Sequence, residues 1–307
     1  MYRLRELPVE IPPSLFEEIR FMPPLGATTA TVGVAARPRV YTRHTLAIRV
    51  MHWINVLAFF LMLMSGLQIF NAHPALNWGK SSYDGKPPLL EIGAHAAADG
   101  AAVGTTTIFG REFTTTGVLG VSAGDDGSPA VRAFPAWATL PGVQWLAMAR
   151  SWHFFFAWIF LLNGLCYVVY SVATRHLRRD LLPNAADTRS IGRSLKDHLL
   201  LRHPKGEAAT HYNVLQKLTY LVVIFVLLPG IIVMGWAMSP WIDALWPGWI
   251  DLVGGRQSAR TLHFVFAFAL LAFVLVHVFE VAISGLWNNL RSMISGRYVV
   301  PPEDTHE

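Results

Sequence analysis

Residues 261–280, TLHFVFAFALLAFVLVHVFE, determine the fold. The stretch is almost wholly apolar, and about 20 residues rising about 1.5 Å each cross the roughly 30 Å core of a bilayer. Its two histidines, His263 and His277, are 14 residues apart. At about 100° per residue, this spacing brings both imidazoles to nearly the same side of the helix, about 21 Å apart along the axis. Ionisable side chains inside a membrane are costly and usually functional.

The composition is that of a membrane protein. Of the 307 residues, 53% are hydrophobic and 15% are charged, against about 25% charged residues in soluble domains. The net charge is +5, but the basic residues cluster beside apolar runs, which is a topology signal and does not indicate nucleic-acid binding. The single cysteine, Cys166, excludes an intrachain disulfide, an iron–sulfur cluster held by this chain alone and a covalent C-x-x-C-H haem site.

Four apolar runs predict an all-α membrane protein, built as a bundle of four transmembrane helices. The third of these helices should be kinked at Pro229 and Gly230. The four predicted spans are residues 49–70, 151–173, 214–238 and 261–286. The segments around them are an irregular basic arm (1–48) with one short helix near 14–20, an insertion (71–150), a basic loop (174–213), a short loop (239–260) and a polar tail (287–307).

The insertion, residues 71–150, is rich in Gly, Thr, Pro and Ala. Residues 105–118 are expected to form a β-hairpin with Gly110 and Arg111 at its turn. A short interfacial helix anchored by Trp145 is expected over 141–150. Ordered insertions of this length are usually functional, so we expect this one to dock a partner.

The basic residues also predict the orientation. They concentrate in 1–48, 174–213 and the C-terminal tail, so both termini and the basic loop are predicted to be cytoplasmic. Residues 190–201 should form an amphipathic helix lying on that membrane surface. The insertion and the 239–260 loop then face outward, into the periplasm if the membrane is the inner membrane of a Gram-negative bacterium.

Four of the twelve histidines lie within the spans, and their depths match in pairs. In the predicted topology, His52 and His277 are near the cytoplasmic surface, whereas His153 and His263 are near the outer surface. Two bis-histidine haem b groups, one in each leaflet, explain this matching. Such a haem has no open axial position and carries electrons.

Two further roles are open to these histidines. Each imidazole can simply hydrogen-bond a neighbouring helix. Alternatively, histidines line a metal-transport path, which should add Asp, Glu or Cys in the middle of the spans. Only Cys166 is found there.

Further residues are candidates for contacts with the haems. Gly66 and Gly164 face the same way as His52 and His153, where a flat macrocycle needs room, although glycine also serves plain helix packing. Arg49 and Arg175 are candidates for haem propionates, or act only as topological anchors. Glu280 and the phenylalanines either surround the haems or face lipid and the membrane surface; the phenylalanines are Phe154, Phe155, Phe264, Phe266 and Phe268.

A quinone site needs hydrogen-bond donors beside a haem. The start of the third span offers His211, Tyr212, Asn213 and Gln216 on the cytoplasmic side. The alternative is that these four are ordinary polar residues of the interface.

Three motifs resemble a known family. Arg49-x-x-His52-Trp53, Trp152-His153 and the 14-residue spacing of His263 and His277 are similar to the di-haem cytochrome b subunits of thiosulfate reductases, formate dehydrogenases and nickel–iron hydrogenases. The cytochrome b561-like four-helix group is similar in the same way. The resemblance covers about residues 50–286. The basic arm and the insertion depart from the family pattern, and the insertion most resembles that of the thiosulfate-reductase type.

The resemblance implies two b haems, a quinone site at one membrane face, and a partner oxidoreductase docked on 71–150 and 239–260, often a molybdenum enzyme or a hydrogenase. The predicted function is thus electron transfer between the quinone pool and a periplasmic partner. One alternative is a stand-alone membrane oxidoreductase that reduces quinone with a small donor such as superoxide. Another is a haem-free anchor or a metal transporter.

Overall fold

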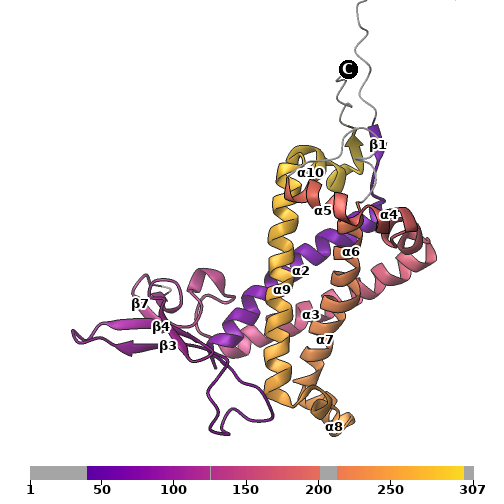
Figure 1. Ribbon diagram of the computed structural model, residues 1–307. Helices are drawn as coiled ribbons and strands as arrows, with labels where there is room; N and C mark the ends of the chain where they lie inside the picture. The colour runs from indigo at the N-terminus through magenta and orange to yellow at the C-terminus, as the bar shows by residue number, and fades with distance from the viewer. Residues whose placement is uncertain (1–39, 125, 201–212, 301–307) are drawn as a thin grey trace, which may run out of the picture. The chain divides into compact units, whose positions relative to one another are not determined.

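The computed structural model describes residues 40–124, 126–200 and 213–300 (Figure 1). The helix expected near 14–20 lies outside these residues, as do His211 and Tyr212. Within them, four helices are long and apolar enough to cross a membrane: α2 (Leu46–Asn71), α3 (Leu146–Ala173), the joined helix Val214–Ala237 and α9 (Arg256–Ile283).

The helices α3 and α9 begin earlier than the sequence predicted. The separate interfacial helix expected over 141–150 is wrong, because α3 continues unbroken from Leu146 with Trp145 at its N-cap position. No proline or glycine lies between Gly142 and Gly164 to interrupt the first turns of the helix. Helix α9 starts directly after Gly255, and the preceding 239–260 loop contains α8 (Pro240–Leu245) and the 3-10 turn η6 (Trp249–Val253).

The third long helix has three parts. They are α6 (Val214–Val222), the π-helical segment η5 (Val223–Leu227) and α7 (Leu228–Ala237). Pro229 comes just after η5; it lacks an N–H and its ring crowds the carbonyl four residues earlier, so the helix widens there. Beside it, a Cβ at Gly230 would lie 2.6 Å from the ring of Phe266 on α9. Glycine at position 230 therefore lets α7 and α9 approach closely.

The insertion folds into β-structure. A four-stranded antiparallel sheet has the order β2-β3-β4-β5, and β6 pairs with β7. The strands are β2 (Ala75–Leu76), β3 (Leu90–Ala96), β4 (Ala102–Ile108), β5 (Arg111–Thr114), β6 (Gly120–Ala123) and β7 (Pro129–Arg132). The expected hairpin is β4–β5, but its turn residues are Phe109 and Gly110, and Arg111 already pairs with Ile108. Both turn residues have positive φ, as a two-residue hairpin loop matching the strand twist requires.

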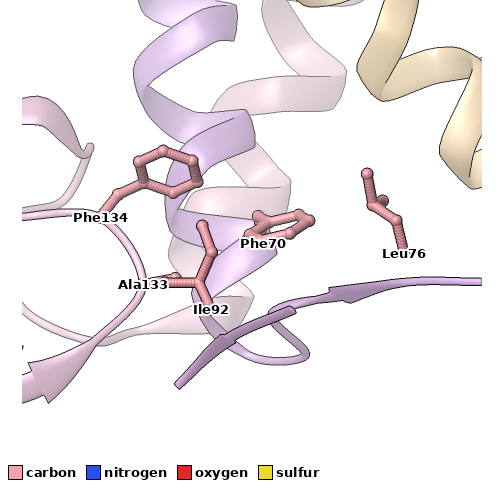
Figure 2. Close-up of a cluster of buried hydrophobic side chains, with 5 residues drawn as sticks. All are labelled: Phe70, Leu76, Ile92, Ala133 and Phe134. Carbon is pink, nitrogen blue, oxygen red and sulfur yellow. The ribbon is translucent and has the colours of Figure 1, made fainter. Parts of the chain in front are cut away.

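A small apolar core joins the insertion to the membrane helices (Figure 2). It consists of Phe70 at the end of α2, Leu76 and Ile92 from the sheet, and Ala133 with Phe134 after β7. Phe264 and Phe268 of α9 pack against this cluster. These two phenylalanines, considered as haem neighbours from the sequence, thus hold the insertion.

Backbone bonds fix the insertion to the start of α9. The carbonyl of Gly79 accepts hydrogen bonds from the amides of Gln257 and Ser258, at 3.1 and 3.2 Å, and so satisfies free donors of the first helical turn. The Ser258 hydroxyl in turn accepts from the amide of Gly79 at 2.8 Å. Thr261 Oγ1 donates to the carbonyl of Asn77 at 2.7 Å. The helix that carries His263 is therefore anchored by the insertion.

The opposite ends of the helices carry smaller elements. Strand β1 (Val40–Thr42) pairs antiparallel with β8 (Arg297–Val299), and α10 (Leu286–Ser295) lies between glycines with positive φ. The tail predicted to be simply polar thus contains a helix and a strand. The basic loop contains the π-helical turn η3 (Leu177–Leu181), α4 (Ala185–Arg189) and α5 (Ile191–Leu199), where the amphipathic helix was expected.

Candidate metal centres

The four membrane histidines meet in two pairs. His52 on α2 faces His277 on α9 with ring centres 6.4 Å apart. His153 on α3 faces His263 on α9 with ring centres 6.2 Å apart. We call His153 and His263 the outer pair and His52 and His277 the inner pair, after the membrane side predicted for each. Helix α9 thus supplies one imidazole to each centre.

Both ring separations fit a metal ion between two imidazole nitrogens. In a five-membered ring with bonds of about 1.35 Å, a nitrogen lies about 1.1 Å from the centre. Metal–imidazole bonds are about 2.0–2.1 Å, so a linear N–metal–N arrangement separates the ring centres by about 6.3 Å. A direct hydrogen bond with about 2.9 Å between nitrogens would bring the centres to about 5.2 Å. The observed spacings agree with the first arrangement.

Each centre offers two histidine ligands from the part of the chain that the structure describes. Among the residues that the structure describes, no group of three or more His, Cys, Asp or Glu side chains is placed to hold a metal ion. Structural zinc sites take four such ligands. A metal ion between these pairs would therefore draw its other ligands from a bound molecule, and the four nitrogens of a porphyrin are suited to this.

The outer imidazoles are held by the helices beside them. His153 Nδ1 lies 3.1 Å from the Met62 carbonyl of α2, and His263 Nδ1 lies 2.9 Å from the Ile231 carbonyl of α7. Because a carbonyl only accepts, both Nδ1 atoms carry the proton and donate it. Nε2 of each ring keeps its lone pair for a metal, which is the usual arrangement of a metal-binding histidine.

A glycine lies beside each of these rings. A Cβ at Gly66 would lie 3.4 Å from Cε1 and 3.6 Å from Nδ1 of His153. Gly235 has the same two distances to His263. Each glycine comes four residues after the carbonyl that the ring contacts, so the α2–α3 and α7–α9 pairs repeat one small motif. The sequence suggested Gly66 for a macrocycle, but in the structure it faces His153; Gly235 was missed.

Gly164, the second glycine suggested for a macrocycle, has open space beside it. Among the described residues, nothing lies within 4 Å of the position of its Cβ. Its role beside a haem stays a prediction.

The inner imidazoles have aromatic neighbours in place of carbonyls. His277 stacks on Phe273 with ring centres 5.8 Å apart, and His52 meets Trp53 edge-on at 5.4 Å. In the described part of the chain, neither inner ring forms a hydrogen bond. Each inner imidazole is therefore oriented by ring contacts.

The arginines suggested for propionates differ in their surroundings. Arg49 Nη1 donates to the Ile294 carbonyl of α10. Arg175 is exposed and has a positive φ of 58° just after α3 ends. Their pairing with haem propionates stays a prediction.

Two further arginines were missed. Arg150 and Arg260 each precede an outer histidine by three residues, just as Arg49 precedes His52. This spacing places arginine and histidine on one helix face. The side chains of Arg150 and Arg260 lie over the rings of Phe154 and Phe70. The Arg-x-x-His pattern occurs three times in the sequence, and this repeat indicates Arg150 and Arg260.

Asn213 and Gln216, two of the four polar residues suggested for quinone, have a structural role at the start of α6. The Gln216 amide donates to Asn213 Oδ1 at 2.8 Å, and the Asn213 amide donates to Gln216 Oε1 at 3.2 Å. This reciprocal pair is a capping box for α6. His211 and Tyr212 lie outside the described residues, so quinone binding here stays a prediction.

Two titratable groups near the inner ends of the helices have shifted pKa values. The hydrogen bond from Lys217, 2.8 Å away, lowers the pKa of Asp187. Burial, helped by the charge of Arg43, lowers the pKa of His44 to about 4. His44 is therefore uncharged at neutral pH.

Comparison with known sequences defines the class. The family model of the prokaryotic cytochrome b561 matches residues 43–296, so the chain belongs to this family. It is a multi-pass membrane protein of the haem b-binding cytochrome b561 type, and the predicted b561-like resemblance is confirmed. A particular relative is the putative protein-methionine-sulfoxide reductase subunit YedZ1 of Azospira oryzae. The two are 27% identical over 252 residues, which cover 80% of this chain and 92% of the relative.

Proposed function

We propose that this chain is a di-haem electron-transfer subunit that links the quinone pool to an oxidoreductase on the outer face of the membrane. The observation that carries the proposal is the pairing of four membrane histidines at ring separations of 6.2 and 6.4 Å. Haem b bound between such pairs supplies one-electron chemistry through its iron.

Helix α9 contributes one histidine to each proposed haem site. His263 and His277, 14 residues apart, hold the two centres at depths that differ by about 21 Å. A haem iron held by both imidazoles of a pair would have no free position for oxygen. The apolar side chains of the four long helices keep water away and limit the exchange of charge to electrons.

The proposed partner is a reductase that acts on oxidised methionine in proteins. The curated relative is named as a subunit of such an enzyme, and the match covers 80% of this chain. With this partner, the two histidine pairs would hold the haems that could carry electrons between quinone and the reductase. The insertion and the 239–260 loop are the proposed docking surface; they carry exposed aromatic side chains, namely Phe109, Trp137, Trp241 and Trp246.

Haem counting in single-histidine variants tests this function. Purified wild-type protein should give two b haems per chain in a pyridine haemochrome assay. His263→Ala should lose the outer haem and His52→Ala the inner one, because each variant removes one of two axial ligands. His95→Ala, an exposed position on β3, is the matched control and should keep both. Retention of two haems in either ligand variant would refute the pairing.

A further inference from the structure

The outer and inner centres differ in how their imidazoles are hydrogen-bonded. From this difference we propose that Ser65 is a positioning residue which, together with the backbone carbonyls of Met62 and Ile231, gives the outer haem a lower reduction potential than the inner haem. The inference rests on the proposed function, namely two bis-histidine haems.

The geometry at the outer centre is built by the neighbouring helices. His153 Nδ1 contacts the carbonyl of Met62, and His263 Nδ1 contacts the carbonyl of Ile231. Within its own helix, each of these carbonyls also accepts a hydrogen bond from the backbone amide of the residue four positions later. The amides four residues on are those of Gly66 and Gly235. A Cβ at either glycine would lie 3.4 Å from Cε1 and 3.6 Å from Nδ1 of the imidazole, which is an ordinary contact.

Ser65 adds a second acceptor at His153. Its Oγ lies 3.2 Å from His153 Nδ1 and 2.6 Å from the Leu61 carbonyl. Since its hydrogen is directed to Leu61, the Ser65 oxygen presents a lone pair to the imidazole N–H. Ser65 is fully buried, so this contact is shielded from water and correspondingly strong.

Hydrogen bonding of this kind changes the metal's electronics. An imidazole that donates its Nδ1–H to an acceptor becomes a more basic ligand through Nε2. A more basic axial ligand stabilises ferric over ferrous iron, and hydrogen bonding around the ligands is one of the levers on haem potential. Both outer imidazoles have such acceptors, whereas neither inner imidazole has one among the described residues. Each tenfold gain in the preference for ferric iron lowers the potential by about 59 mV.

The consequence is a difference in reduction potential between the outer and the inner centre. At equilibrium a single electron in the protein favours the inner centre. The outer centre is the stronger reductant of the two, and it lies beside the insertion that is proposed to receive the partner.

Optical redox titration tests the inference. Wild-type protein should show two components, and the component that remains in His263→Ala, which is the inner haem, should be the one of higher potential. Ser65→Ala, which removes only a hydroxyl, should raise the lower potential and leave the higher one unchanged, with two haems retained. Ser295→Ala, the matched control at an exposed position of α10, should change neither.

Two results would overturn the inference. One is retention of the lower-potential component in His263→Ala. The other is an unchanged lower potential in Ser65→Ala while two haems remain bound. Either result leaves two bis-histidine haems in the wild-type protein, whereas fewer than two haems there would defeat the proposed function itself.

Discussion

The two ends of α9 carry the same residue in different surroundings. At the outer end, His263 donates to a carbonyl of α7, and the insertion caps the helix within two turns of it. At the inner end, His277 rests on Phe273 and faces His52 without a hydrogen bond in the described part of the chain. Two centres with the same histidine ligands can therefore differ, because the neighbouring residues determine whether each imidazole donates a hydrogen bond.

The largest loss of haem should come from disturbing the contact between Gly230 of α7 and Phe266 of α9, the helix that carries one histidine of each pair. Gly230→Ala would place a methyl group 2.6 Å from the Phe266 ring, and overpacking of this kind costs about 1–3 kcal/mol. Because α9 bears a ligand for each centre, we expect loss of haem from both, measured by haem content after purification. Combining Gly230→Ala with Phe266→Leu should restore part of the haem. No loss in Gly230→Ala would show that α7 and α9 are not closely packed.

A smaller effect, on the temperature of haem release, should distinguish the outer centre from the inner centre. Ser258→Ala removes the hydroxyl that accepts the Gly79 amide, and leaving a buried donor unpaired costs about 1–3 kcal/mol. We expect the outer haem to be released at a lower temperature while the inner haem is released as in wild type, as followed by absorbance during heating. Ser295→Ala on the exposed side of α10 is the control. Equal destabilisation of both haems would mean that the insertion does not support the outer centre specifically.

The weakest effect is a pH dependence at the inner end. His44 has a pKa of about 4 in the folded protein and a usual value of 6.5. Between these values the unfolded chain binds a proton that the folded chain does not, so stability falls as the pH is lowered below about 6.5. The slope from this group is at most about 1.4 kcal/mol per pH unit.

His44→Gln should make the acid-induced loss of stability shallower between pH 6.5 and 4, as measured by unfolding in denaturant in detergent at several pH values. His95→Gln, at an exposed position, is the control and should keep the wild-type slope. An identical pH profile for His44→Gln and wild type would contradict the burial of His44.

Helical geometry makes the histidine pairs predictable. In a transmembrane helix, residue number converts directly into depth and facing direction, so four positions and a topology suffice to match His52 with His277 and His153 with His263. The bounds of α3 and α9 were less accurate, because polar residues before an apolar run give no sign of whether the helix has already begun. The Arg-x-x-His repeat was present in the sequence and was used only at Arg49.

Features that depend on contacts between distant residues were not predictable in this way. The acceptors of the outer imidazoles are backbone carbonyls, which leave no trace in residue type; Gly235 gains its meaning only from its contact with His263. The sheet of the insertion pairs short strands, and only the local β4–β5 hairpin could be predicted. Strand β8 pairs with β1 across most of the chain, a contact that no local pattern indicates.

Axial ligation of one haem by each histidine pair is open to a direct measurement. Low-temperature electron paramagnetic resonance of the oxidised, purified protein, calibrated to the protein concentration, reports the spin state and the number of ferric haems together. We expect two low-spin ferric haem signals per chain and no high-spin signal, because every iron has two strong imidazole ligands. A high-spin signal of comparable intensity, or fewer than two haems per chain, would show that the pairs do not ligate in this way.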